Sequence, residues 1–331
     1  MTHNNATLKE IAALANVHIS TVSRALSGSP LVKPDTAERV REVAKRLEYR
    51  REMMLKGVVS GKTFTVGVLI PDMSNSFYAE ICGGVMEELQ RNGYSVLLGC
   101  TNFSANEERE FVDLFIAKKV EGIVSVSARY SDIPHIMPAV FIEAVPECKG
   151  VTVVSIDNFE AAAHMGEYLA KMGHRRIGFI GDTKTTIQRY RGFSAGLEKH
   201  GLVLDPMLTV IDEERMEKGG YNKMSLLLQR PVRPTAVFCV NDYLAIGALQ
   251  AIHDAGLRVP EDISVTGFDG IQTSSYVQPS LTTVIQPKEK MGRMGAELLL
   301  KEICGERAPG GRVVLPFSLA ERKSAVPPCK E

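Results

Sequence analysis

The chain has no net charge, because its 331 residues include 39 lysines and arginines and 39 aspartates and glutamates. A neutral total argues against nucleic-acid binding, which usually requires an excess of basic residues. The charge is unevenly distributed, however. Residues 1–63 hold 11 basic and 6 acidic residues, whereas the remainder holds 28 and 33. A basic N-terminal segment on a mildly acidic body is the distribution expected when DNA binding is confined to one end of a chain.

Several motifs are also missing. The six cysteines have neither a CxxC pair nor the Cys/His spacing of a metal site, so we expect free thiols and no metal. The dinucleotide and phosphate-loop motifs are absent, so we expect neither an enzyme nor a cofactor. The apolar runs have only strand length, and the N-terminus lacks the pattern of a secretion signal. We therefore expect a cytoplasmic protein without a membrane partner.

The most informative stretch is TLKEIAALANVHISTVSRAL, residues 7–26. Thr7 and Glu10 have the spacing of a capping box, which predicts the start of a helix. Apolar residues at helical spacing continue to Ala15, and Asn16 suits the left-handed backbone of a tight corner. A second helix is expected over about 19–26, so the stretch has the pattern of a helix-turn-helix.

The outward face of this second helix carries small hydroxyls and one arginine, namely Ser20, Thr21, Ser23 and Arg24. Hydroxyls bind phosphates or base edges, and arginine binds guanine through two parallel hydrogen bonds, so this face suits the DNA major groove. The alternative is a helical hairpin with a solvated polar face. A third helix is expected from Pro34 to Leu47, which completes a small all-α domain with a thin core.

From residue 64 onward, short apolar runs alternate with helical segments, which predicts parallel sheets covered by helices on both faces. About 265 residues are too many for one such sheet, so we expect an α/β body of two doubly wound lobes. The expected strands are 64–70, 95–100, 122–127, 140–143, 151–156, 176–180, 235–240, 263–266 and 282–285. The expected helices are 77–92, 107–118, 159–172, 186–200, 219–229, 242–255 and 288–304.

The chain resembles the lactose/galactose repressor family of bacterial transcription regulators over nearly its whole length. Besides residues 7–26, the resemblance rests on VKPDTAERVREVAKRLEYR, VGVLIPDMSNSFYAEI, VNDYLAIGAL, VTGFDG and PSLTTVIQP, in the family's order and near its spacing. It implies a periplasmic-binding-protein-like body with three crossovers between lobes and a ligand in the cleft. The implied domains are a helix-turn-helix domain at 1–49, a hinge at 50–63 and an effector-binding and dimerisation domain at 64–331. Lobe one would then be about 64–157 and 288–316, and lobe two about 158–287 and 317–331.

The resemblance also implies DNA contacts in the hinge. In the family, the linker after the residue matching Tyr49 folds on operator DNA and inserts a leucine pair into the minor groove, which bends the duplex. Here Arg51 and Glu52 replace the family's Pro-Asn pair, and Val58 stands at the leucine position. We expect Val58 to insert with weaker bending, which bend angles of the wild type and Val58→Leu would test. An ordinary exposed linker is the alternative. The expected DNA-binding residues are Thr7, Ile19, Ser20, Thr21, Ser23, Arg24, Tyr49, Met54 and Val58.

Polar and aromatic residues follow the expected strand ends, where open α/β sheets bind their ligands. The span 122–157 looks shorter than is usual in the family, and 131–138 makes a poor helix because it contains two prolines. Glu143 is therefore the least supported effector contact. Phe77 has a core alternative, and Asp72, Asn158 and Asp242 have the alternative of capping helices. The effector-binding residues that the resemblance implies are Phe77, Tyr78, Glu143, Arg189, Asn241 and Asp269.

These features together predict a sequence-specific DNA-binding transcriptional regulator, a repressor, that acts as a homodimer. A small molecule between the lobes, a sugar or sugar derivative, would control its affinity for double-stranded operator DNA. The tail SAVPPCKE has no heptad pattern, so no tetramer-forming extension is expected. The first alternative is the same architecture controlled by a phosphoprotein partner. A binding protein or enzyme without a DNA role is the second, and it lacks supporting motifs.

Overall fold

The computed structural model describes residues 8–26, 29, 31–46, 62–129, 132–143, 151–183, 185–306 and 310–329. The chain divides into two compact units, Met1–Phe64 and Thr65–Glu331. Thr7, Tyr49, Met54 and Val58 lie outside the described residues, as does nearly all of the expected hinge.

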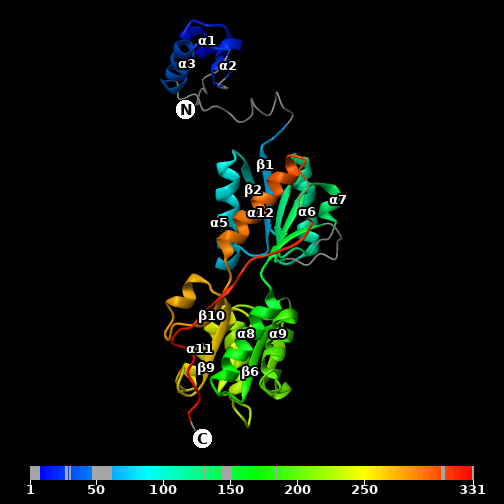
Figure 1. Cartoon of the computed structure of the whole chain (residues 1–331), viewed down its shortest axis with the longest axis vertical. Coiled ribbons are helices and arrows are strands. Elements are labelled where there is room, and N and C mark those ends of the chain that lie inside the picture. Colours follow the sequence, from blue (N-terminus) through cyan, green and yellow to red (C-terminus); the bar gives the residue numbers. More distant parts are fainter. Residues whose placement is uncertain are drawn as a thin grey trace. The chain divides into compact units, whose positions relative to one another are not determined.

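The N-terminal unit contains three short helices, α1 (Leu8–Ala15), α2 (Ile19–Leu26) and α3 (Pro34–Arg46) (Figure 1). Asn16 has a φ of 50°, so it adopts the left-handed conformation expected at the corner between α1 and α2. Each helix contributes one apolar face to a shared core of seven buried residues. These are Ile11, Ala15, Val22, Ala25, Ala37, Val40 and Ala44. The expected helix-turn-helix fold is confirmed.

The body contains two six-stranded sheets, as expected for a doubly wound α/β fold. The first sheet is parallel throughout and has the order β11-β5-β4-β3-β1-β2. Its strands are β1 (Thr65–Ile70), β2 (Ser95–Cys100), β3 (Ile123–Val126), β4 (Ala139–Ile142), β5 (Thr152–Ser155) and β11 (Gly311–Val314).

The second sheet has the order β12-β10-β9-β8-β6-β7, and only its edge strand β12 is antiparallel. Its strands are β6 (Ile177–Asp182), β7 (Thr209–Asp212), β8 (Ala236–Cys239), β9 (Ser264–Asp269), β10 (Thr282–Ile285) and β12 (Ser318–Ala320). The chain passes from one sheet to the other three times, after β5, after β10 and after β11.

Helices cover both sheets, and several pack in pairs. Helix α5 lies beside α12 and α8 beside α9 (Figure 1). Helix α10 packs against α11. The helices of the body are α5 (Ser76–Arg91), α6 (Ala105–Ala117), α7 (Ile133–Ile136), α8 (Asn158–Lys171), α9 (Thr186–Glu198), α10 (Glu217–Leu228), α11 (Asp242–Asp254) and α12 (Lys288–Ile303). Among the described helices, none combines the length and apolar character that crossing a bilayer requires.

Glycines allow these helix pairs to approach closely. A Cβ at Gly292 of α12 would collide with the carbonyl oxygen of Ile81 in α5, and one at Gly84 would collide with that of Glu289. A Cβ at Gly192 of α9 would likewise collide with the carbonyl oxygen of Phe159 in α8. The helix pairs therefore pack backbone against backbone, which leaves no room for a side chain at these positions.

Three strands were not expected from the sequence: β7, β11 and β12. Most of their residues are half-buried or exposed. Edge strands need no continuous apolar run, so a search for such runs misses them. The stretch expected to be a poor helix forms only the single turn α7, with Pro134 near its start.

Candidate functional site

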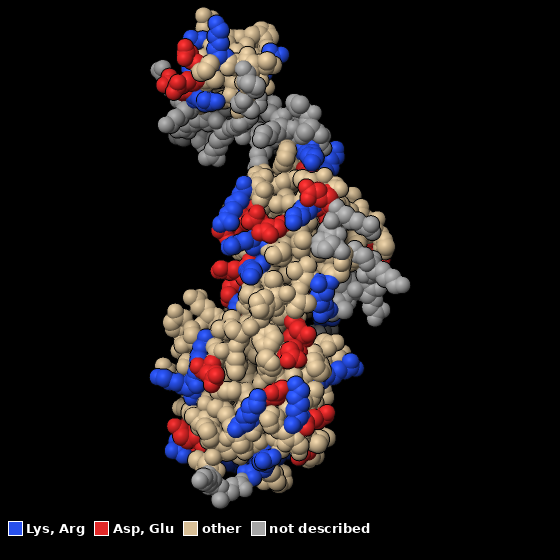
Figure 2. All heavy atoms as spheres, in the orientation of Figure 1, with Lys and Arg blue, Asp and Glu red and all other residues tan. Residues whose placement is uncertain are grey.

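Helix α2 presents a polar surface on the N-terminal unit. Ser20, Ser23 and Arg24 are exposed, and Ile19 and Thr21 are half-buried, while the opposite face of the helix is buried in the core. Figure 2 shows lysine and arginine side chains on several sides of this unit. The expected DNA-facing residues in α2 are therefore available at its surface.

His18 was not expected from the sequence to take part in this surface. Its Nδ1 lies 2.8 Å from the Ser20 Oγ and accepts a hydrogen bond from the Ser20 backbone N–H at 3.4 Å. This is the position and the bond of a helix N-cap, so a search for caps that included histidine would have found it. His18 orients the Ser20 hydroxyl at the start of α2.

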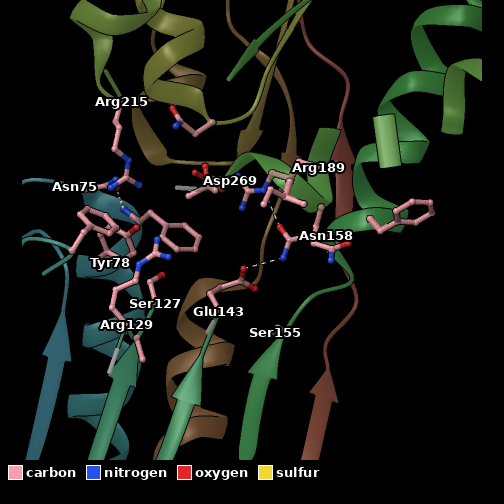
Figure 3. Close-up of a pocket in the computed structure, with 18 of the residues that line it drawn as sticks. Asn75, Tyr78, Ser127, Arg129, Glu143, Ser155, Asn158, Arg189, Arg215 and Asp269 are labelled. Carbon is pink, nitrogen blue, oxygen red and sulfur yellow. Dashed lines mark hydrogen bonds and ion pairs between the residues drawn. The ribbon is translucent and has the colours of Figure 1, made fainter. Parts of the chain in front are cut away.

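The six residues expected to bind an effector all line one cavity of about 330 Å³ in the body (Figure 3). Glu143 follows β4 of the first sheet, whereas Asn241 follows β8 and Asp269 ends β9 of the second sheet. The carboxyl ends of both sheets border this cavity, which is the ligand position expected for open α/β sheets. The full set is Phe77, Tyr78, Glu143, Arg189, Asn241 and Asp269.

Arg189 occupies the centre of a polar chain at one end of the cavity. Its Nε donates to Asn158 Oδ1 at 2.8 Å, and its Nη1 donates to Asp269 Oδ1 at 3.0 Å. Its guanidinium carbon lies 3.8 Å from the ring centroid of Phe268. Asn158 Nδ2 in turn donates to Glu143 Oε2 at 2.9 Å. The chain from Glu143 to Asp269 thus connects the ends of the two sheets.

Both carboxylates of this polar chain are held in constrained surroundings. Glu143 has a φ of 55° and Asp269 a φ of 109°, which are unfavourable values for residues with a Cβ. Burial raises the pKa of Glu143 and that of Asp269, and the nearby charge of Arg189 opposes the increase in both. Such carboxylates are suited to accept hydrogen bonds from ligand hydroxyls in a site sheltered from water.

Aromatic rings and cations form the other end of the cavity. Tyr78 packs edge-on against Phe77 and Phe103, with ring centroids 5.3 and 6.0 Å away. The guanidinium carbon of Arg215 lies 3.6 Å from the Phe103 ring centroid. Burial raises the pKa of Tyr78, so its hydroxyl remains protonated and able to donate. Arg129 lines this end as well.

The capping alternatives for Asp72, Asn158 and Asp242 are wrong. The helix caps are Asn75 for α5, Asp157 for α8 and Asn241 for α11. Asp72 instead accepts hydrogen bonds from Ser74, and Asn158 joins Glu143 to Arg189. The pairs 157–158 and 241–242 each contain two residues suited to capping, so a sequence pattern cannot choose between them.

Asn241 has a structural role as well as a place in the cavity. Its Oδ1 accepts a hydrogen bond from the Leu244 backbone N–H at 2.8 Å, which caps α11. Its side-chain amide nitrogen lies 3.5 Å from Asp182 Oδ2. Phe77 is similarly 95% buried while it lines the cavity, so the core and the binding interpretations both apply to it.

Further lining residues were not expected from the sequence. Ser127 and Ser155 lie at the ends of β3 and β5, so the rule that ligands bind at strand ends could have found both. Arg215 follows β7, an unexpected edge strand, and Phe103 follows β2 in a loop without a distinctive motif. The lining residues missed include Phe103, Ser127, Arg129, Ser155, Arg215 and Arg312.

Comparisons with known proteins agree with this architecture. Residues 7–52 match bacterial regulatory proteins of the lacI family, and residues 167–325 match a periplasmic binding protein-like domain. The chain is 34% identical over 329 residues to the HTH-type transcriptional repressor CytR of Escherichia coli (strain K12), which covers 96% of each chain.

Solved structures resemble it as well. A transcriptional regulator CelR in complex with cellobiose is 30% identical, with a TM-score of 0.72 over 97% of this chain and 100% of the other. The Lac repressor dimer bound to operator and the anti-inducer ONPF has a TM-score of 0.87 over 98% of this chain and 100% of the other. At 23% identity, that second likeness shows the shared fold. The chain is a helix-turn-helix transcriptional regulator and belongs to the lacI family of bacterial regulatory proteins.

Proposed function

We propose that this protein is a homodimeric repressor whose affinity for operator DNA is controlled by a sugar-like molecule in the cavity of the body. The observation that carries this proposal is the meeting of six effector-type side chains from both sheets in one cavity of about 330 Å³. Carboxylates and amides fix hydroxyl groups, and aromatic faces pack on rings, so the lining suits a small polyhydroxylated ligand. The cellobiose bound to the similar regulator CelR supports the same ligand class.

The proposed control acts through the angle between the lobes. A ligand that contacts Glu143 beside the first sheet and Asp269 in the second favours one arrangement of the two sheets. In a homodimer, this arrangement sets the spacing of two α2 helices, which enter successive major grooves of a near-palindromic operator. The coupling is reciprocal, so operator DNA changes ligand affinity by the same factor.

Within the DNA-binding unit, we assign base preference to the start of α2. Ile19 and Ser20 begin this helix, and His18 orients the Ser20 hydroxyl. Arg24 adds a side chain that can form paired hydrogen bonds with guanine. Thr21 and Ser23 provide hydroxyls for phosphates or base edges. Thr7, Tyr49, Met54 and Val58 remain predicted DNA contacts that lie outside the described residues.

Selection of bound sequences from random DNA tests the proposal directly. We expect the wild type to recover a near-palindromic operator, and sugars to change its affinity for that operator in fluorescence anisotropy. Exchange of the residues at positions 19 and 20 should alter the recovered operator and leave ligand affinity unchanged. Arg39→Gln on the exposed face of α3 is the control, and it should retain the wild-type operator. A protein that binds all DNA equally, with every compound tested, would contradict the proposal.

A further inference from the structure

The cavity has two chemically different ends. Figure 3 shows Glu143, Ser155, Asn158 and Arg189 toward one end, Asn75, Tyr78, Ser127, Arg129 and Arg215 toward the other, and Asp269 between them. The first end contains the Glu143 carboxylate of the polar chain described above. The second end has aromatic rings, a hydroxyl, an amide and two guanidinium groups, with no carboxylate among its labelled residues.

Arg215 is held firmly at the second end. Its guanidinium packs on the Phe103 ring and donates a hydrogen bond to the Tyr78 hydroxyl oxygen. Its Nε is buried and, among the described residues, has no hydrogen-bond partner. Asp182 Oδ1 is 3.7 Å from this nitrogen, and the same carboxylate already accepts the backbone N–H and the hydroxyl of Thr185. Arg215 is thus fixed between an aromatic ring and a buried carboxylate, while its Nε makes no hydrogen bond within the described part of the chain.

Arg129 reaches the same end from the other lobe. It follows β3 of the first sheet and is exposed, whereas Arg215 follows β7 of the second sheet. Figure 3 shows both side chains extending toward Tyr78 from opposite sides. Two guanidinium groups that approach from different lobes can both bind one group placed between them.

The cavity lining holds four arginines, Arg129, Arg189, Arg215 and Arg312, and three carboxylates, Glu143, Asp157 and Asp269. Arg189 is paired with Asp269 at 3.0 Å, and Arg215 Nε lies 3.7 Å from Asp182 Oδ1. The N-termini of α5, α8 and α9 also border the cavity, and their backbone dipoles favour negative charge.

We propose that the effector carries a carboxylate or phosphate group that binds between Arg129 and Arg215, while its hydroxyl groups reach Glu143, Asn158 and Arg189. This inference rests on the proposed function, because it assigns a chemical class to the ligand of the same cavity. The Tyr78 and Ser127 hydroxyls line this end, and Ser127 hydrogen-bonds to the Tyr78 oxygen, so the Tyr78 O–H supplies a further donor. The bound group would be a sugar acid, a sugar phosphate or a compound of the same chemistry.

Matched pairs of compounds test the inference on the full-length protein. Glucose, glucuronate and glucose 6-phosphate form one series, and ribose with ribose 5-phosphate forms another. We expect at least one anionic member to bind about tenfold or more tightly than its neutral partner, since hydrogen bonds to charged groups are stronger than those between neutral groups. Preference for glucuronate over glucose 6-phosphate, or the reverse, distinguishes the carboxylate from the phosphate.

Inorganic phosphate provides a probe that is independent of the sugar. At matched ionic strength, phosphate should raise the melting temperature of the wild type more than chloride does. Arg215→Gln and Arg129→Gln should each lose most of this additional shift. Arg191→Gln removes the same charge from an exposed position on α9 outside the cavity lining, and it should keep the shift. Phosphate bound to the DNA-binding unit would affect all these proteins equally, so the difference between variants reports on the cavity.

The outcomes separate the two proposals. Equal phosphate shifts in the wild type, Arg129→Gln and Arg215→Gln would overturn the anion site, as would neutral sugars that bind as tightly as their anionic partners. In either case, a neutral compound that changes operator affinity would leave the proposed function intact. If no compound, neutral or anionic, changes operator affinity, the proposed function itself fails.

Discussion

Arg189 Nη1 lies 3.0 Å from Asp269 Oδ1, and the two side chains are only 6% and 9% exposed. The same carboxylate oxygen accepts a hydrogen bond from Gln286 Nε2 at 2.8 Å. The pair joins α9 to the end of β9, and both residues line the cavity.

Removal of the carboxylate charge tests this relationship. Asp269→Asn leaves the Arg189 cation buried without its counter-charge, so the free energy of unfolding should fall by about 3 kcal/mol. Urea unfolding measures the change. The exposed pair Arg258–Asp262 provides the control, because Asp262→Asn should leave stability nearly unchanged. Equal effects of the two substitutions would show that burial of the Arg189–Asp269 pair has no energetic consequence.

A hydrogen bond between the lobes provides a second prediction. The Ser76 backbone N–H donates to the Tyr243 hydroxyl at 2.9 Å, and that hydroxyl lies 3.1 Å from Ser76 Oγ. Tyr243→Phe removes both contacts, so the lobes should separate more readily and the radius of gyration in small-angle scattering should increase. Tyr221→Phe removes a hydroxyl that bonds to Asp254 within the second lobe, and it should leave the radius unchanged. An unchanged radius in Tyr243→Phe would argue against a role in holding the lobes together.

Two adjacent glycines of α5 should respond oppositely to alanine. A Cβ at Gly84 would collide with the backbone of Glu289, so Gly84→Ala should lower the free energy of unfolding by about 1–3 kcal/mol. A Cβ at Gly83 meets no atom within 4 Å, so Gly83→Ala should raise it by about 0.5–1 kcal/mol through better helix propensity. Thermal unfolding at one fixed protein concentration compares them. Destabilisation by both substitutions would indicate that Gly83 also contacts another surface.

The buried carboxyl of Asp242 predicts a dependence of stability on pH. Burial, with a smaller contribution from the charge of Asp269, raises the pKa of Asp242 from 3.8 to about 7. The folded protein therefore binds the proton more tightly than the unfolded chain does. The associated stability is fully present below about pH 4 and is lost as the pH rises to about 7.

Asp242→Asn removes this ionisable group, so the difference in the free energy of unfolding between the wild type and the variant should report its titration. Between about pH 5 and about pH 8, the free energy of unfolding of the wild type should decrease relative to that of Asp242→Asn. Urea unfolding at several pH values measures both proteins. The Thr283 hydroxyl and the Ile271 backbone N–H donate hydrogen bonds to this carboxylate, and Asp242→Asn alters both. The resulting change in the free energy of unfolding does not vary with pH. A constant difference across the range would refute the raised pKa.

The N-terminal unit shows how much local pattern can determine. Apolar residues such as Ile11, Val22 and Val40 recur at helical spacing, and Asn16 marks the corner, so the three helices and their core could be predicted. In the body, the buried central strands were predictable because both of their faces are covered and their sequences are apolar runs. The edge strand β7 is short and only half-buried, and it was not expected, so the loop after it that carries Arg215 was overlooked as part of the site.

The sequence alone determined the two-part architecture, the recognition helix and the six candidate effector residues, because these depend on local periodicity, on strand ends and on motifs that a family shares. Only the tertiary structure decided which other side chains join them. Arg129 and Arg215 are 86 positions apart and follow strands of different sheets, and no local pattern relates them. Their approach depends on how two lobes close around one cavity, which is a property of long-range packing.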